Sequence, residues 1–203
     1  MVPLFPETTE RWLAVIAGVL ISVAQFILLR DVWRRKMSPA MLSWIGWALL
    51  MGTSLVSQII AKGWAWSLVG LSISTFGCVC IFSLSWIRKS YLIGKMDWWF
   101  LILGIICFAI YLASKDPWMT TGFALLADVI IGIPTIHKAY LYPLTQKTIG
   151  WTIALGSWSI TLLICIGHNW LYDLFPIYLF LYNGIMFMLT HRSRIAVPLA
   201  VNE

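Results

Sequence analysis

Seven long apolar runs, separated by short polar joints, dominate this chain of 203 residues. A helix needs about 20 mainly apolar residues to cross the hydrocarbon layer of a bilayer. Strands of a porin-like barrel would alternate polar and apolar residues instead, and these runs do not. The pattern therefore predicts an all-α integral membrane protein with seven transmembrane helices. The runs are Trp12–Leu29, Met41–Ala61, Trp64–Ile87, Trp98–Ala113, Trp118–Ile136, Thr148–Gly167 and Trp170–Thr190.

The composition agrees with a membrane location, and the charge pattern predicts an orientation. Hydrophobic residues make up 61% of the chain and charged residues 11%, whereas soluble domains have about 45–50% and about 25%. Eleven of the 14 Lys and Arg residues follow the odd-numbered runs. Because these residues favour cytoplasmic joints, the N-terminus is expected outside and the C-terminus in the cytoplasm. The net charge of +6 is thus a topology signal, and no nucleic-acid partner is expected.

Individual residues extend this topology prediction. Lys36, Lys89 and Lys147 are expected to face the cytoplasm, and Lys62 and Lys115 the opposite side. Tryptophans near the ends of the runs are expected in the headgroup layers, where an amphipathic ring is stable. These belt tryptophans are Trp12, Trp33, Trp44, Trp64, Trp86, Trp98, Trp99, Trp118, Trp151 and Trp170.

Several kinds of membrane chemistry lack the residues that they need. A retinal Schiff base requires a lysine within a span, and every lysine lies in a joint. The three histidines, His137, His168 and His191, lie at span ends on different connections, which disfavours a metallohydrolase. The four cysteines lie within apolar runs, form no CxxC pair and are expected to be packing residues. We therefore expect no metal, no cofactor and no enzymatic activity.

A loose internal repeat divides the chain into two halves. The stretch AQFILLRDVWRRKMSPAMLSWIGWALL starts at Ala24, and IPTIHKAYLYPLTQKTIGWTIALGSW starts at Ile133. In each, a span leads through a basic and aromatic joint into a Ser- or Thr-rich span start. Both stretches include a cytoplasmic joint, so the halves have the same orientation only if one extra span separates them. This predicts a first three-helix repeat over 12–87, a linker helix over 98–113 and a second repeat over 118–190.

These features resemble the PQ-loop superfamily, which includes the SWEET sugar carriers, the lysosomal amino-acid exporters and the more distant KDEL receptors. The resemblance covers span number, orientation and repeat position over nearly the whole chain. The second motif has Pro134, with Thr135 in place of the motif glutamine, and the first has Gln25, with Ala24 in place of the proline. The resemblance implies two three-helix bundles around a central solute site, with Gln25 and Pro134 at hinge or gate positions.

Two polar residues lie near the middle of predicted spans. Asp128 is the only carboxylate near the middle of a span, and burying it is costly unless it faces protein or water. It either binds a proton or cationic solute or bonds a neighbouring helix. The resemblance makes Asn183 a candidate ligand for solute hydroxyls, since SWEET carriers place an asparagine in the third helix of each repeat. The third span has Ser74 near the matching position, and interhelical hydrogen bonding is the alternative for Asn183.

Two tryptophans, Trp47 and Trp158, lie deeper in their spans than the belt residues. Each could stack on a solute in a cavity wall, although plain packing explains them as well. Asp128 and Asn183 are expected to share a mid-membrane cavity with them. Gln25 and Pro134 are candidate gate residues. Interhelical hydrogen bonding is the alternative role for Gln25, and structural bending of the helix is the alternative role for Pro134.

The function that we expect is transport of a small polar solute by alternating access. The alternative is a non-transporting seven-helix receptor or sorting protein of the same fold, because fold does not determine function. The expected partners are the solute and the lipid bilayer. The oligomeric state is left open, and a homo-oligomer is compatible with these features.

Overall fold

The computed structural model describes residues 4–113, 117–166 and 173–192, which form eight helices and no strand. The helices are α1 (Glu7–Trp33), α2 (Met41–Lys62), α3 (Leu68–Arg88), α4 (Lys95–Ala113), α5 (Pro117–Leu141), α6 (Pro143–Gln146), α7 (Gly150–Cys165) and α8 (Leu174–His191). The all-helical class predicted from the apolar runs is confirmed. Gly167 and Trp170, where two predicted spans end and begin, lie outside the described residues.

Local sequence explains where several helices begin and end. Pro6 directly precedes α1 and cannot donate a backbone hydrogen bond. Gly63 follows α2 with φ of 80°, a left-handed conformation that a glycine adopts without a steric penalty. The one-turn helix α6, which the apolar pattern does not predict, has Pro143 at its first position.

Within the described part of the chain, four helices are long and apolar enough to cross a membrane by length and composition. They are Glu7–Trp33, Leu68–Arg88, Gly122–Leu141 and Leu174–His191. Three shorter apolar helices cover Met41–Val56, Asp97–Ile110 and Gly150–Cys165. These elements indicate membrane association, and crossing by all seven stays a prediction.

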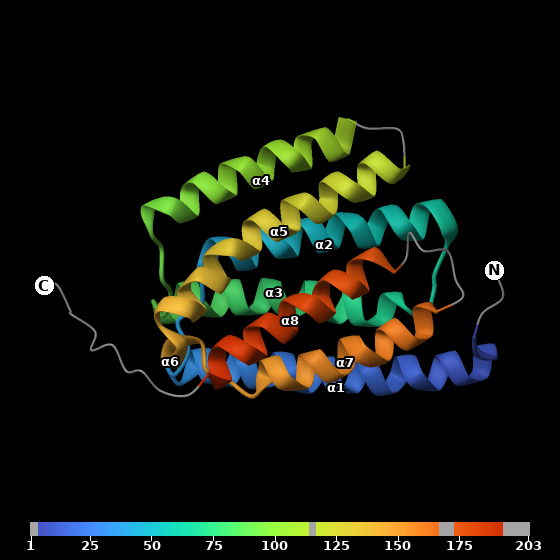
Figure 1. Ribbon diagram of the computed structural model, residues 1–203, viewed down its shortest axis with the longest axis horizontal. Helices are drawn as coiled ribbons and strands as arrows, with labels where there is room; N and C mark the ends of the chain where they lie inside the picture. Colours follow the sequence, from blue (N-terminus) through green and yellow to red (C-terminus); the bar gives the residue numbers. More distant parts are fainter. Residues whose placement is uncertain (1–3, 114–116, 167–172, 193–203) are drawn as a thin grey trace, which may run out of the picture.

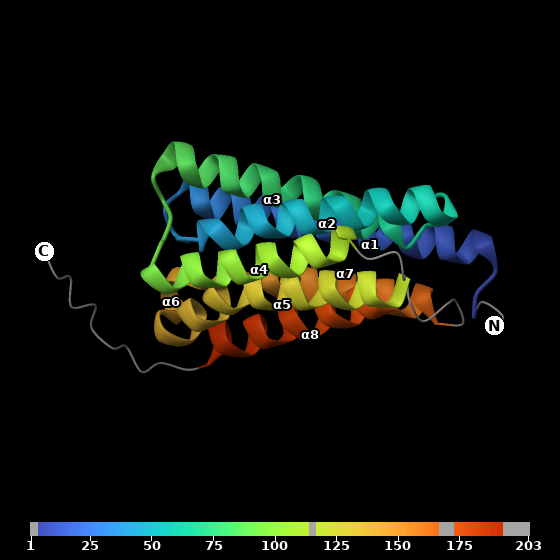
Figure 2. The same ribbon diagram turned by 90° about the horizontal axis from the view of Figure 1, so that it is seen from above.

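Six of the long helices form a closed ring. Around this ring the order is α1, α3, α2, α5, α8 and α7, with α7 packing back against α1. Helix α4 lies outside the ring against α5 and α2 (Figures 1 and 2). Successive long helices run in alternating directions, so their connections gather at the two ends of the molecule (Figure 1).

Large apolar side chains cover the outside of the helices. Phe76 of α3 is 71% exposed and Trp99 of α4 is 73% exposed, and Trp12 and Phe26 of α1 are also largely exposed. Apolar exposure on this scale is uncommon on soluble proteins and suits contact with lipid. The inward faces meet closely where side chains are small: a Cβ on Gly18 would lie 2.9 Å from Cγ1 of Val69.

Hydrogen bonds join the connections at one end of the ring. We call this the basic end; it comprises residues 34–40, 89–94 and 142–149 and carries Arg34, Arg35, Lys36, Lys89 and Lys147. The backbone N–H of Ser38 donates to the carbonyl of Thr145 (3.1 Å), and the N–H of Leu92 donates to the carbonyl of Pro39 (3.0 Å). The first connection is therefore tied to both of the others.

Candidate functional site

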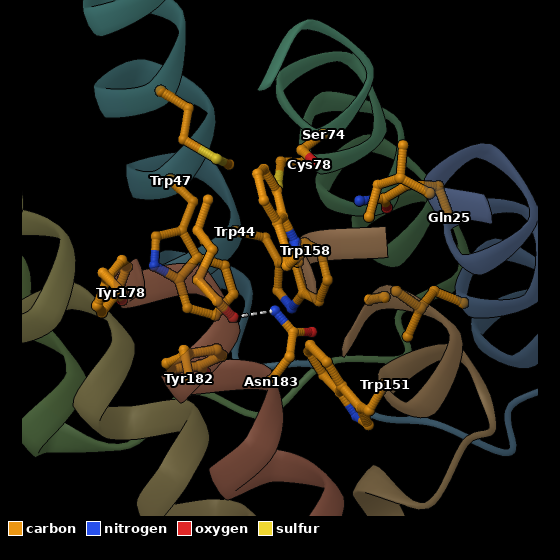
Figure 3. A pocket seen from close by; sticks show the side chains of 15 residues that line it. Gln25, Trp44, Trp47, Ser74, Cys78, Trp151, Trp158, Tyr178, Tyr182 and Asn183 are labelled. Carbon is orange, nitrogen blue, oxygen red and sulfur yellow. Dashed lines mark hydrogen bonds between the residues drawn. The ribbon is translucent and has the colours of Figure 1, made fainter. Parts of the chain in front are cut away.

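A cavity lies inside the ring, between α1, α2, α3, α7 and α8 (Figure 3). Its volume of about 50 Å³ holds about four water molecules, at 10–15 Å³ for each. A larger solute requires the helices to move apart. The wall consists of Ile21, Gln25, Leu28, Trp44, Trp47, Met51, Ser74, Cys78, Trp151, Ala154, Trp158, Tyr178, Leu179, Tyr182 and Asn183.

Aromatic rings form much of this wall. Trp47 packs edge-on against Trp44 and Tyr182, with ring centroids 5.3 and 5.2 Å apart. Trp151 lies 6.0 Å from Trp44 and 6.3 Å from Tyr182. These separations are typical of stabilising aromatic pairs, which hold one another in fixed orientations. The cavity therefore has a rigid wall that offers ring faces and edges to a ligand.

Four polar atoms of the wall are buried without a hydrogen-bond partner among the described residues. They are Oε1 of Gln25, Nε1 of Trp44, Oγ of Ser74 and the hydroxyl oxygen of Tyr182. A buried donor or acceptor without a partner costs about 1–3 kcal/mol, and most native groups avoid this state. The wall thus offers an acceptor, a donor and two hydroxyls to whatever occupies the cavity.

Asp128 does not line the cavity. Asp128 lies on α5 and is 0% exposed. Its backbone carbonyl accepts hydrogen bonds from Nε1 of Trp47 (3.4 Å) and from the hydroxyl of Tyr178 (3.2 Å). Its two carboxyl oxygens have no hydrogen-bond partner within the described part of the chain. Asp128 is thus absent from the lining of the cavity that Asn183 lines, although two wall residues donate to its backbone carbonyl; a binding role for Asp128 stays a prediction.

Asn183 lies on the wall with its amide already engaged. Its Nδ2 donates to the carbonyl of Leu179 one turn earlier in α8 (2.7 Å; Figure 3). Gln25 owes its position to a glycine on the facing helix, since a Cβ on Gly77 would lie 2.4 Å from Cδ of Gln25. The close approach of α1 and α3 at this point thus depends on the missing side chain of Gly77.

Of the seven residues singled out in the sequence, Gln25, Trp47, Ser74, Trp158 and Asn183 lie on the cavity wall. Asp128 and Pro134 do not; Pro134 is buried within α5. Whether any of the seven binds a solute or acts as a gate stays a prediction.

The expected belt position is wrong for Trp44 and Trp151. They are 2% and 4% exposed and belong to the cavity wall. The indole N–H of Trp151 donates to the carbonyl of Gln146 (3.1 Å), which holds the ring inward. Trp44 and Trp151 occupy equivalent positions in the two repeat motifs, and this equivalence was the sequence signal that could have placed both on the wall. Sequence reasoning also missed Cys78, Tyr178 and Tyr182 as wall residues.

Comparison with known proteins returns no relative: no family model, no curated protein and no solved structure matches this chain. Among the described residues, no three His, Cys, Asp or Glu side chains are grouped so that they could hold a metal ion. The cavity is therefore interpreted from its own geometry.

Proposed function

We propose that this chain is a membrane transporter that moves a small polar solute by alternating access through the central cavity. In this proposal it has the 3+1+3 architecture of the PQ-loop superfamily, with α1–α3 and α5–α8 as parallel repeats and α4 as the linker. The single observation that carries the proposal is the set of unpartnered polar atoms on one enclosed wall. A polar solute would satisfy these atoms without displacing any bond within the protein.

The packing order of the helices supports two equivalent halves. In the first half α3 lies between α1 and α2, and in the second α8 lies between α5 and α7. The halves meet through α1 with α7 and through α2 with α5. This pattern is unchanged when the halves are exchanged, which an arrangement of parallel repeats requires.

The spacing of the wall residues supports the same symmetry. Helix α2 contributes Trp44, Trp47 and Met51, at intervals of three and four residues. Helix α7 contributes Trp151, Ala154 and Trp158, at the same intervals. Residues at these spacings share one helix face. Each half therefore presents its second long helix to the cavity in the same register.

The basic end has the features of a closed gate. Nε2 of Gln146 donates to the carbonyl of Ser38 (2.7 Å), which adds to the backbone bond between Ser38 and Thr145. These bonds join the connection of the first half to that of the second. In an alternating-access cycle they would break when the cavity opens toward this end.

Solute flux into proteoliposomes tests the proposal. A panel of small polar solutes is first screened for those that raise the melting temperature of the purified protein, and uptake of each positive solute is then measured. Ser74→Ala should reduce uptake, because it removes an unpartnered wall hydroxyl. Ser72→Ala is the matched control on the same helix, since the hydroxyl of Ser72 already donates to the carbonyl of Leu68 (2.9 Å).

The alternative function is a receptor or sorting protein with the same fold. The small volume of the cavity agrees with it, because a receptor needs ligand access from one side only, whereas a transporter must open to both sides. A solute that binds with saturation and shows no flux in the same liposomes would support the receptor and contradict the transporter.

A further inference from the structure

Two further cavities continue the central one toward the end of the molecule where α1 begins. One, of about 20 Å³, shares Trp158 and Leu179 with the central cavity and also includes Ser67. The other, of about 290 Å³, includes Ser67 and opens between the start of α1, the α2–α3 connection and the end of α7. We call this larger space the outer vestibule. Because neighbouring cavities share wall residues, the three lie in series.

Charge along this series has one sign. Glu7 and Glu10 line the outer vestibule, and no Lys, Arg or His is among the described residues that line any of the three cavities. Arg11 lies near the vestibule with its guanidinium over the ring of Trp66, at 5.2 Å from the centroid. These carboxylates therefore favour cations over anions at the outer vestibule.

Aromatic side chains line the cavities at both ends of the series. Trp64 and Trp66 line the outer vestibule, and the contact of Arg11 with Trp66 already pairs a cation with a ring. The central cavity has four tryptophans and two tyrosines on its wall. Such rings attract cations through the negative potential of their faces, most strongly where water is excluded.

Asp128 supplies a carboxyl group close to this aromatic wall. The group is fully buried without a hydrogen-bond partner in the described residues, and it takes part in neither of the described ion pairs, Arg30–Asp31 and Lys138–Asp97. Trp47 and Tyr178 both attach to its backbone carbonyl. A cation bound at this wall would favour the ionised form of the carboxyl group, because the interior screens the attraction between opposite charges weakly.

We propose that the solute of the central cavity is a small organic cation, an ammonium ion with a compact apolar body, that enters from the outer vestibule and has Asp128 as its counter-charge. This inference rests on the proposed function and specifies its substrate class. The cation would lie against the aromatic wall, and its polar groups would meet the unpartnered atoms of Gln25, Ser74 and Tyr182.

Binding of a matched pair of probes to the full-length protein in lipid nanodiscs tests this inference. The probes are choline and its uncharged isostere, in which a tert-butyl group replaces the trimethylammonium group. Choline should bind at least about tenfold more tightly, the effect of one desolvated cation–π contact. Asp128→Asn should reduce this preference to the part supplied by the aromatic wall and leave binding of the isostere unchanged. Asp31→Asn is the control, because Asp31 is a buried carboxylate on α1 that lines none of the three cavities.

A second measurement applies if Asp128→Asn does not fold. Cys78 lies on the central wall, so a variant that keeps only this cysteine reports access to the cavity. In the labelling reaction the thiolate attacks the reagent sulfur, forms a disulfide and releases methanesulfinate. A trimethylammonium methanethiosulfonate should modify Cys78 faster than the sulfonate analogue, after each rate is divided by the rate with free cysteine.

The outcomes separate this inference from the proposed function. Equal affinity for choline and its isostere, no binding of choline, or equal corrected labelling rates would overturn cation recognition. A choline preference of unchanged size in Asp128→Asn would overturn the role of Asp128. Binding of choline without flux in liposomes would refute transport and leave cation recognition standing. Flux of an uncharged solute without any cation preference would refute cation recognition and leave transport standing.

Discussion

The ion pair between Lys138 of α5 and Asp97 of α4 gives the sharpest stability prediction. Both residues are buried, and the two side chains are in direct contact. Nζ of Lys138 also donates to the carbonyl of Leu92 (2.9 Å), and the carboxylate of Asp97 accepts the N–H of Gly94 (2.9 Å). The pair therefore joins the C-terminal part of α5, beyond Pro134, to the start of α4.

Replacing Lys138 by Met leaves the buried carboxylate of Asp97 with the single N–H of Gly94. Breaking a buried pair by removing one partner typically costs about 3–5 kcal/mol. We expect Lys138→Met to lower the free energy of unfolding by about 3 kcal/mol, a change of roughly 150-fold in the unfolding equilibrium constant. Denaturant titration of the purified protein in mixed micelles measures this change.

A double-mutant cycle identifies the cause of the loss. Adding Asp97→Leu to Lys138→Met should recover part of the stability, because no unpaired buried charge then remains. Arg30→Met is the control, since Arg30 is half-exposed and its contact with Asp31 at 3.3 Å should contribute less than about 1 kcal/mol. A loss below 1 kcal/mol for Lys138→Met, or losses that simply add in the double variant, would refute the reasoning.

Three further predictions concern the cavity and the ends of the molecule. Gly77→Ala should weaken solute binding, because its methyl group would displace the side chain of Gln25; binding equal to that of the unchanged protein would contradict this. Gln146→Ala should speed labelling of Cys78 by a small maleimide, because it removes a bond that closes the basic end; an unchanged rate would mean that this bond is no part of the gate. A cysteine at Lys89 should react with an impermeant reagent only from the cytoplasmic side, and reaction in intact cells would contradict the proposed orientation.

The apolar runs were enough to predict the all-helical class and several helix boundaries. The predicted run Met41–Ala61, for example, corresponds to α2 at Met41–Lys62. The prediction of helices succeeds because about 20 apolar residues in succession have few stable alternatives to a helix in or near a membrane. The run Trp12–Leu29 misses the ends of α1, which spans Glu7–Trp33. Helices can extend into polar sequence, where hydropathy gives no signal.

The cavity wall was only partly predictable from the sequence. Trp47 and Trp158 were selected by their depth within the spans, and both lie on the wall. The same criterion of depth wrongly assigned Trp44 and Trp151 to the headgroup layer, because a residue near a helix end faces inward when a neighbouring connection covers it. Asp128 lies about midway along α5, but no described residue of α5 lines the cavity. A single sequence of mainly apolar residues does not encode the rotation of a helix about its axis in its hydrophobic pattern, since its lipid-facing and buried sides are both apolar.

The unequal lengths of α1 and α7 affect how an electric field would cross the molecule. Helix α1 has 27 residues and α7, packed beside it, has 16, so at 1.5 Å per residue they differ by about 16 Å. The outer vestibule lies where α7 ends and Glu7 and Glu10 continue. In a bilayer, water in this recess shortens the low-dielectric path to the centre. A membrane voltage, worth about 2.3 kcal/mol per elementary charge for each 100 mV, then falls over a shorter distance.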